Sequence, residues 1–320
     1  MRKFALLLLA TVCLYTANAQ VAAAKKAGKK TKKETINRVG TWKRGGIFSL
    51  NVNQGGYDNW ISAGDADWSI GANGYISLYA NKAWAGKKKA KLKTWTNSLD
   101  INQAIQSIHD ERTDINAFNK LDDRIDFLSK YGVELKNKIY FSTIFNARTQ
   151  LYDTKIAGKR ISGFFAPGVV TLAPGFEWKP SSAFSAFLSP LSNRFVIVTN
   201  GPNSIAANLS QTKPYGVLPS RQVDWQPGAY LSLNLNADLD KAKKVNLKSR
   251  LDLYSNYANS PQNMDLFFTN ILSMKVNKWI SASVNLTMIY DDDVRQFGFL
   301  RNKPGLQYNH NIGVGVTRRF

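Results

Sequence analysis

The sequence predicts an all-β fold, a transmembrane antiparallel up-and-down β-barrel of about twelve strands, with ten or fourteen left open. Three observations predict it. After residue 45 apolar and polar residues alternate, often over more than about ten residues, whereas soluble strands usually have about five or six. Membrane strands need about nine to eleven residues. The connections alternate between short and long, and aromatic residues gather at strand ends, as in barrels of the bacterial outer membrane.

The N-terminus predicts export. Arg2 and Lys3 precede a short apolar stretch, and Ala17 and Ala19 form a small-residue cleavage site. This pattern is typical of a secretory signal peptide. Residues 1–19 are therefore expected to be removed near Ala19. Cys13 is the only cysteine and leaves with the signal, so the mature chain has no disulfide.

Residues 20–44 form a separate basic segment in which Glu34 is the single acid. Such a segment buries too little apolar area to fold alone, so we expect a flexible periplasmic arm. The arm is either a solvated leader or a contact for peptidoglycan, anionic lipid or a periplasmic protein. The chain carries a net charge of +21. Because no nucleic-acid-binding motif is present, lipid headgroups and lipopolysaccharide phosphates are the expected counter-surfaces, and no nucleic acid is expected.

The barrel domain is expected over residues 45–320. In its first strand Phe48, Leu50 and Val52 share one face, and the residues between them are polar. The same apolar faces recur in Trp68, Ile70, Ala72, Ile76, Leu78 and Ala80, in Leu231, Leu233 and Leu235, and in Ile280, Ala282, Val284, Leu286, Met288 and Tyr290. Pro174 and Pro190 interrupt two strands, and proline cannot donate to a sheet. These positions are expected to be bulges, strand ends or misplaced boundaries.

The connections fall into two sets. Short lysine-rich turns are predicted at residues 87–93, 136–138, 179–183, 240–244 and 277–278, and longer loops at 55–64, 109–120, 153–166, 200–222, 259–262 and 291–306. Short turns are periplasmic in barrels of this kind, so an even strand count places both termini in the periplasm. Aromatics are expected at the periplasmic end at Trp42, Trp84, Trp95, Tyr140, Trp178 and Trp279, and at the outer end at Trp60, Trp68, Tyr152, Trp225, Tyr257 and Tyr290.

The last strand ends the chain at an aromatic residue, Phe320. A terminal aromatic on an alternating strand resembles the signal that the outer-membrane assembly machinery reads, so this machinery is an expected partner. Arg318 departs from that pattern, because an apolar residue is usual two positions before the end. We expect its side chain to extend to the membrane interface.

Several stretches resemble an uncharacterised family of Gram-negative outer-membrane β-barrel proteins. The residues that carry the resemblance are Trp60, Trp95, Asn97, Asp100, Asp122, Asp123, Thr149, Gln150, Pro167, Pro190, Tyr290 and Asp291. They spread over most of the mature chain, and the basic arm lies outside them. The resemblance implies a barrel and an outer-membrane location, and it implies no activity or cofactor.

The polar faces of the strands carry charges of both signs, which are expected to point into the lumen. These are Asp100, Asp126, Lys130, Glu134, Arg148, Glu177, Lys248, Arg250 and Asp252, with Asp265 and Lys275 in addition. Charges removed from water must be paired, and mixed signs on neighbouring strands permit this. The lumen is therefore either closed by ion pairs or a narrow channel for small polar solutes.

Catalytic patterns are weak. Neither His109 nor His310 is followed two residues later by serine, as the barrel lipases require. The acidic run 291–293 and the acids near His109 suggest calcium binding or rim proteolysis only by composition. No phosphate loop or zinc spacing occurs, so no metal or cofactor is expected. The sequence predicts a non-enzymatic barrel with a structural, docking or envelope-assembly role; a solute channel and, least favoured, an outer-rim hydrolase are the alternatives.

Overall fold

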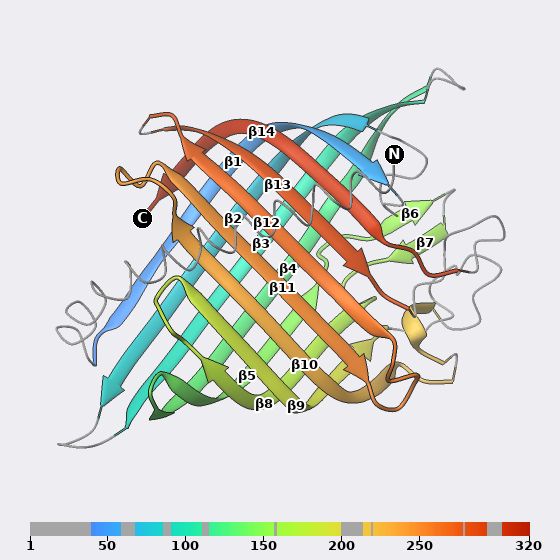
Figure 1. Cartoon of the computed structure of the whole chain (residues 1–320). Coiled ribbons are helices and arrows are strands. Elements are labelled where there is room, and N and C mark those ends of the chain that lie inside the picture. The colour runs from blue at the N-terminus through green and yellow to red at the C-terminus, as the bar shows by residue number, and fades with distance from the viewer. Residues whose placement is uncertain are drawn as a thin grey trace, which may run out of the picture.

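The computed structural model describes residues 40–58, 68–85, 91–110, 115–156, 159–199, 214–218, 220–277, 279–292 and 303–320. Twelve strands form one closed antiparallel barrel, and β6 and β7 form a separate hairpin (Figure 1). The barrel strands are β1 (Trp42–Asp58), β2 (Trp68–Ala85), β3 (Leu92–Asp110), β4 (Ile115–Lys136), β5 (Ile139–Thr149), β8 (Gly168–Trp178), β9 (Phe184–Ile197), β10 (Val223–Asp238), β11 (Val245–Asn256), β12 (Met264–Lys275), β13 (Ile280–Tyr290) and β14 (Gln307–Arg319). The predicted fold class and strand number are confirmed.

The barrel closes where the first strand meets the last. β1 pairs with β14 from Ile47 opposite Arg319 to Asp58 opposite Tyr308. The final residue extends this seam, because Gly46 N donates to Phe320 O at 2.9 Å and Phe320 N donates to Gly46 O at 3.1 Å. Every edge is thereby paired, which a strand needs in order to cross a membrane.

The predicted alternation appears as an outer and an inner face. On β1, Phe48, Leu50 and Val52 are 43%, 54% and 65% exposed, whereas Ser49 and Asn53 are each 7% exposed. In a closed barrel the exposed apolar face is the one that meets lipid, and the polar face lines the lumen. No helix among the described residues is long and apolar enough to cross a membrane.

Both prolines lie at irregularities, as expected. The β8–β9 register shifts between Leu172 and Phe176, which brackets Pro174, and the β9–β10 register shifts beside Pro190. Ser189 Oγ donates to Pro174 O at 2.6 Å and Ser192 Oγ donates to Gly228 O at 2.8 Å. These buried hydroxyl groups bond carbonyls at the places where the regular sheet pairing is broken.

The connections follow the two predicted sets, with three corrections. Residues 55–58 were expected to begin a loop, but β1 runs to Asp58. Residues 109–120 were expected to be a loop, but β3 runs to Asp110 and β4 starts at Ile115, and the two pair as far as Asp110 opposite Ile115. A hairpin can continue beyond the membrane because water solvates both of its faces. Within the predicted loop 153–166, a short hairpin forms from β6 (Thr154–Ile156) and β7 (Lys159–Ser162).

The aromatic residues at the short-turn end form an outward-facing belt, with one exception. Trp42 and Trp95 have ring centroids 5.6 Å apart, and Trp178 lies 6.1 Å from Phe184. Tyr140 was expected in this belt, but it is 7% exposed and shares the inward face of β5. The strand also begins earlier than expected, because Trp42 to Arg44, assigned to the basic arm, belong to β1. Residues 20–39 of the arm and Trp60 lie outside the described residues.

Candidate functional site

The charged side chains predicted to face the lumen meet around Asp126 on β4. Arg148 on β5 donates to Asp126 Oδ2 from Nε at 3.1 Å and from Nη2 at 3.0 Å. Arg250 on β11 lies with Nη1 3.9 Å from the same oxygen, and its Nη2 is 2.6 Å from Asp252 Oδ2. We call these four residues the lumen network. Two acids and two bases balance, as the removal of charges from water requires.

The lumen network joins opposite walls. In the ring order of twelve strands, β11 and β4 are five steps apart by the shorter route. A second crossing is made by Phe267 on β12, whose ring centroid is 4.4 Å from Arg148 Cζ and 5.9 Å from Arg124 Cζ. β12 lies five steps from β5 and six steps from β4, so these contacts span the width of the barrel.

An apolar cluster fills the lumen beside the network. It consists of Ile144, Ala173, Phe187, Tyr230 and Tyr254, with Leu128 packed against it. All five cluster residues are less than 9% exposed. Their strands are β5, β8, β9, β10 and β11, so the cluster occupies the same side of the interior as most of the charged groups. Apolar packing inside the barrel excludes water from this part of the lumen.

A second ion-pair group lies toward the short turns. Glu177 is completely buried and is bonded by Lys130, by Lys179 at 2.9 Å and by Ser142 Oγ at 3.2 Å. The Lys179 ammonium is also 4.7 Å from the ring centroid of Tyr140. Lys130 and Lys179 are therefore both paired with Glu177 inside the barrel, and Tyr140 stacks beside Lys179.

The remaining predicted charges also lie on inward positions. Asp100 accepts a hydrogen bond from Tyr75 at 2.5 Å, and Arg194 is 2.6 Å from Asp265. Glu134, Lys248 and Lys275 make no ion pair within the described part of the chain. They lie near the short-turn end of their strands.

Many inward side chains on the opposite wall of the lumen are small and uncharged. The inward residues of β13, β14, β1 and β2 include Ser281, Ser283, Asn285, Asn309, Asn311, Gly313, Gly315, Thr317, Ser49, Asn51, Asn53 and Asn73. They bond to one another, as in Asn53 Nδ2 to Asn311 Oδ1 at 3.1 Å and Ser49 Oγ to Thr317 Oγ1 at 2.8 Å. We call this surface the amide wall.

Several residues that carry the family resemblance gather where the loop after β5 leaves the barrel. Asp123 accepts hydrogen bonds from Leu151 N at 2.9 Å, Tyr152 N at 2.7 Å and Lys120 Nζ at 3.1 Å. Gln150 Oε1 accepts from the same Lys120 at 3.0 Å and from Ser162 Oγ at 2.9 Å. These contacts hold the loop to the rim, which is a structural task.

The other resemblance residues are spread over three regions. Asp122 accepts from Asn102 Nδ2 at 2.6 Å, Thr149 Oγ1 accepts from Phe165 N at 2.7 Å, and Pro190 O accepts from Tyr257 OH at 2.9 Å. Pro167 lies two residues after Phe165 in the same loop. Tyr290 ends β13 at the outer mouth, and Asp291 follows it. Trp95 and Asn97 face outward at the short-turn end.

The loop after β9 packs on the same rim. Val196 and Val198 form a buried cluster with Ala166 and Val217, and Tyr215 packs against it. Burial raises the pKa of Tyr215 to about 12. The phenol therefore stays neutral at physiological pH, and Tyr215 and Val217 pack apolar surface against this rim.

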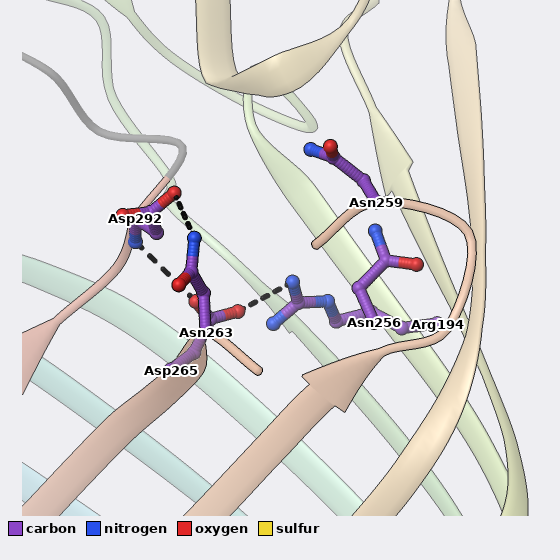
Figure 2. Close-up of a pocket in the computed structure, with 6 residues that line it drawn as sticks. All are labelled: Arg194, Asn256, Asn259, Asn263, Asp265 and Asp292. Atoms are coloured by element: carbon purple, nitrogen blue, oxygen red, sulfur yellow. Dashed lines mark hydrogen bonds and ion pairs between the residues drawn. The ribbon is translucent and has the colours of Figure 1, made fainter. Parts of the chain in front are cut away.

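A small cavity lies at the outer mouth (Figure 2). It is lined by Arg194, Asn256, Asn259, Asn263, Asp265 and Asp292 and has a volume of about 10 Å³, the space of about one water molecule. Asn263 Nδ2 donates to Asp292 Oδ2 at 2.8 Å, and Arg194 is engaged by Asp265. No group of three acidic, histidine or cysteine side chains in the described ranges is arranged to hold a metal ion.

His310 does not form a catalytic pair with an acid in the part of the chain that the structure describes. His310 shares the outward face of β14 with Ile312 and Val314, and its ring lies against Gly56 and 5.5 Å from the Tyr308 ring. The side chain of His109 lies outside the described residues.

The structure places three further residues in the lumen that the sequence did not predict there: Arg194, Phe267 and Arg124. Arg194 lies beyond the bulge at Pro190, and the extra residue there reverses which side-chain parity points inward. Phe267 sits in the apolar run from Leu266 to Phe268, where alternation gives no signal. Arg124 lies two residues before Asp126 on β4, and this shared parity could have placed it in the lumen.

The closed ring of tilted strands, the apolar outer face and the aromatic belt define an outer-membrane β-barrel. Residues 52–154 match a family described as "Protein of unknown function (DUF3078)". This match confirms the predicted resemblance over that segment. No curated protein matches the chain.

Solved structures give weak similarities to other barrels. Outer membrane phospholipase A from Escherichia coli is 10% identical, with 84% of this chain and 89% of that chain covered and a TM-score of 0.39. An outer membrane channel from Pseudomonas putida F1 is 10% identical, with 88% and 96% covered and a TM-score of 0.38. The translocator domain of the autotransporter NalP from Neisseria meningitidis is 11% identical, with 97% and 98% covered and a TM-score of 0.32. Likenesses of this size carry no information on activity.

Proposed function

We propose that this protein is a non-enzymatic, non-conducting outer-membrane barrel with a structural or docking role in the cell envelope. One observation carries the proposal: the contacts of Arg250 with Asp126 and of Phe267 with Arg148 join opposite walls of the lumen. Side chains fill small barrels, whereas an aqueous channel is typical of sixteen or more strands. Twelve strands with cross-lumen contacts match the filled type.

The two ends of the barrel differ in charge, which supports a docking role. The short turns present exposed lysines, among them Lys136, Lys138, Lys241, Lys243 and Lys244. Nearby Asp240 accepts a hydrogen bond from Val245 N at 2.8 Å, which lowers its pKa. This end and the basic arm suit an anionic partner in the periplasm, such as peptidoglycan or an acidic protein.

Planar-bilayer recordings test the closed lumen. The wild-type protein is expected to give no discrete openings. The double variant Arg250→Ala and Phe267→Ala removes both crossings and is expected to conduct. Ser283→Ala on the amide wall is the matched control and should stay silent. Discrete wild-type openings that vanish in Arg148→Ala would refute the closed-barrel proposal.

The amide wall favours a second candidate function, a narrow path for small neutral solutes. Its side chains are uncharged and donate and accept hydrogen bonds. Liposome swelling separates the two candidates. Swelling in glycerol or a small sugar without ionic conductance would support the path, and no swelling would support the closed barrel.

A further inference from the structure

The outward face of β1 to β4 carries an aromatic group at the short-turn end. Trp42 contacts Trp95, and the rings of Trp84 and Tyr131 have centroids 6.2 Å apart. Lys82 lies between these pairs, with its ammonium 5.7 Å from the ring centroid of Trp42 and 5.4 Å from that of Trp84. The sheet register places them together, because Trp42 is opposite Lys82 and Lys82 is opposite Trp95.

Two further cations share this face. Lys93 is opposite Trp84, and Arg44 is opposite Ala80, one row away from Lys82. Arg44 lies two residues after Trp42 on β1, and Lys93 lies two residues before Trp95 on β3. Both side chains therefore share the outward face of these aromatic residues. Neither they nor Lys82 forms an ion pair with an acid among the residues that the structure describes. Three positive charges therefore face the membrane without an anionic partner from the protein.

Polar groups lie beside the cations on the same outward face. Trp95 Nε1 donates to Ser129 Oγ at 2.9 Å, and Ser129 Oγ donates to Asn97 Oδ1 at 2.8 Å. Asn97 Nδ2 donates to Ala80 O at 3.0 Å. Asn97 is opposite both Ala80 and Ser129, so the polar groups and Arg44 form one row across four strands. Polar side chains on a lipid-facing surface are costly in hydrocarbon and suit the headgroup region.

The depth of these rows fits the headgroup region. A strand rises about 3.3 Å per residue and tilts by about 40°, so each residue advances about 2.5 Å across the membrane. An apolar band of about 25 Å then needs about ten residues. On β2 the apolar outward residues run from Ile70 to Ala80, and Lys82 follows. The cations and the aromatic rings therefore lie at the boundary with the periplasmic leaflet.

We propose that Arg44, Lys82 and Lys93 form a binding site for the phosphate of an anionic phospholipid in the periplasmic leaflet. The aromatic rings would contact the glycerol backbone and the upper acyl chains, since amphipathic rings favour this depth. Asn97 and Ser129 would accept or donate hydrogen bonds to headgroup hydroxyls. The site is on the outer surface, so it does not depend on whether the lumen conducts.

Native mass spectrometry of the full-length protein tests the site with phosphatidylglycerol as the probe. The variant Arg44→Gln, Lys82→Gln and Lys93→Gln removes the three cations. Lys241→Gln, Lys243→Gln and Lys244→Gln removes the same charge from an exposed turn and serves as the matched control. The mobility shift on unheated gels verifies that each variant folds. Each cation near a membrane surface contributes about 1 kcal/mol, so the site variant is expected to lose at least about tenfold in affinity.

Three results decide the proposal. Loss of phosphatidylglycerol in the site variant but not in the turn variant supports it. Equal loss in both variants, or loss in neither, overturns it, because binding would then follow total charge or use other groups. Competition by inorganic phosphate separates the two sources of phosphate. Displacement of the lipid by inorganic phosphate at a similar concentration would overturn a lipid site, and retention of the lipid supports one.

Discussion

Removal of the Asp126 carboxylate is expected to destabilise the barrel strongly. Asp126 is 8% exposed and accepts two hydrogen bonds from Arg148, one from Asn146 and a longer contact from Arg250. In Asp126→Ala, Arg148 keeps no carboxylate partner among the described residues, while Arg250 retains Asp252. Breaking a buried ion pair by removing one partner costs about 3–5 kcal/mol. Because Arg250 still pairs with Asp252 in the variant, we expect a loss at the lower end of this range, about 3 kcal/mol.

The urea midpoint converts this cost into a measurable shift. Denaturant slopes for small proteins are about 1–3 kcal/mol per molar urea. A loss of about 3 kcal/mol therefore lowers the midpoint by roughly 1–3 M. Unfolding of the refolded protein in detergent would be followed by tryptophan fluorescence and, in parallel, by the folded band on unheated gels. Agreement of the two probes is needed before a free energy is calculated.

Asp153→Ala is the matched control, because Asp153 also pairs with an arginine. Its contact with Arg160 is 2.9 Å long, but the Asp153 side chain is 49% exposed. Exposed pairs contribute about 0–1 kcal/mol, so the midpoint should move little. Equal shifts in the two variants would refute the reasoning, because burial of the lumen network would then add nothing. An unchanged Asp126→Ala midpoint would refute it as well.

Three further predictions concern the backbone. Lys243 has a φ of 56°, a conformation that favours glycine, so Lys243→Gly should raise stability by up to about 1 kcal/mol in the same titration. A lower midpoint would contradict this. Ser189→Ala removes the hydroxyl that bonds Pro174 O and should cost about 1–3 kcal/mol, whereas exposed Ser182→Ala should cost almost nothing; equal costs would count against a role for the bulge. Deletion of Phe320 removes two backbone hydrogen bonds to Gly46 at the seam and should slow the appearance of the folded gel band in a refolding time course; unchanged kinetics would contradict this.

The barrel could be predicted because its strands obey a period of two. Side chains of a strand point alternately to lipid and lumen, so the polarity pattern reports the geometry directly. The run from Ile280 to Tyr290 was placed without error, and most short turns were placed within about two residues. The length of the β3–β4 hairpin could not be predicted in this way, because polar residues are compatible with both strand and loop above the membrane.

The lumen was predicted less completely than the fold. Parity identified Asp126, Arg148, Arg250 and Asp252 as inward charges, but it could not say which of them meet. That depends on which strands face each other across the ring. Arg194 was missed because the bulge at Pro190 adds a residue to the strand, and the side chains after it point to the opposite face from the one that simple alternation predicts.

The cross-lumen contacts also join the two halves of the chain. Strand pairing fixes the circumference of a barrel, but a ring of hydrogen-bonded strands can be round or flattened without breaking those bonds. The contacts of Asp126 with Arg250 and of Arg148 with Phe267 fix the distance between opposite walls. Asp126 and Arg148 lie within the family-matched segment 52–154, whereas Arg250 and Phe267 lie outside it. The cross-section is thus set by contacts between this segment and the second half of the chain, and a fixed cross-section gives the turns and the outward lipid-facing site constant positions.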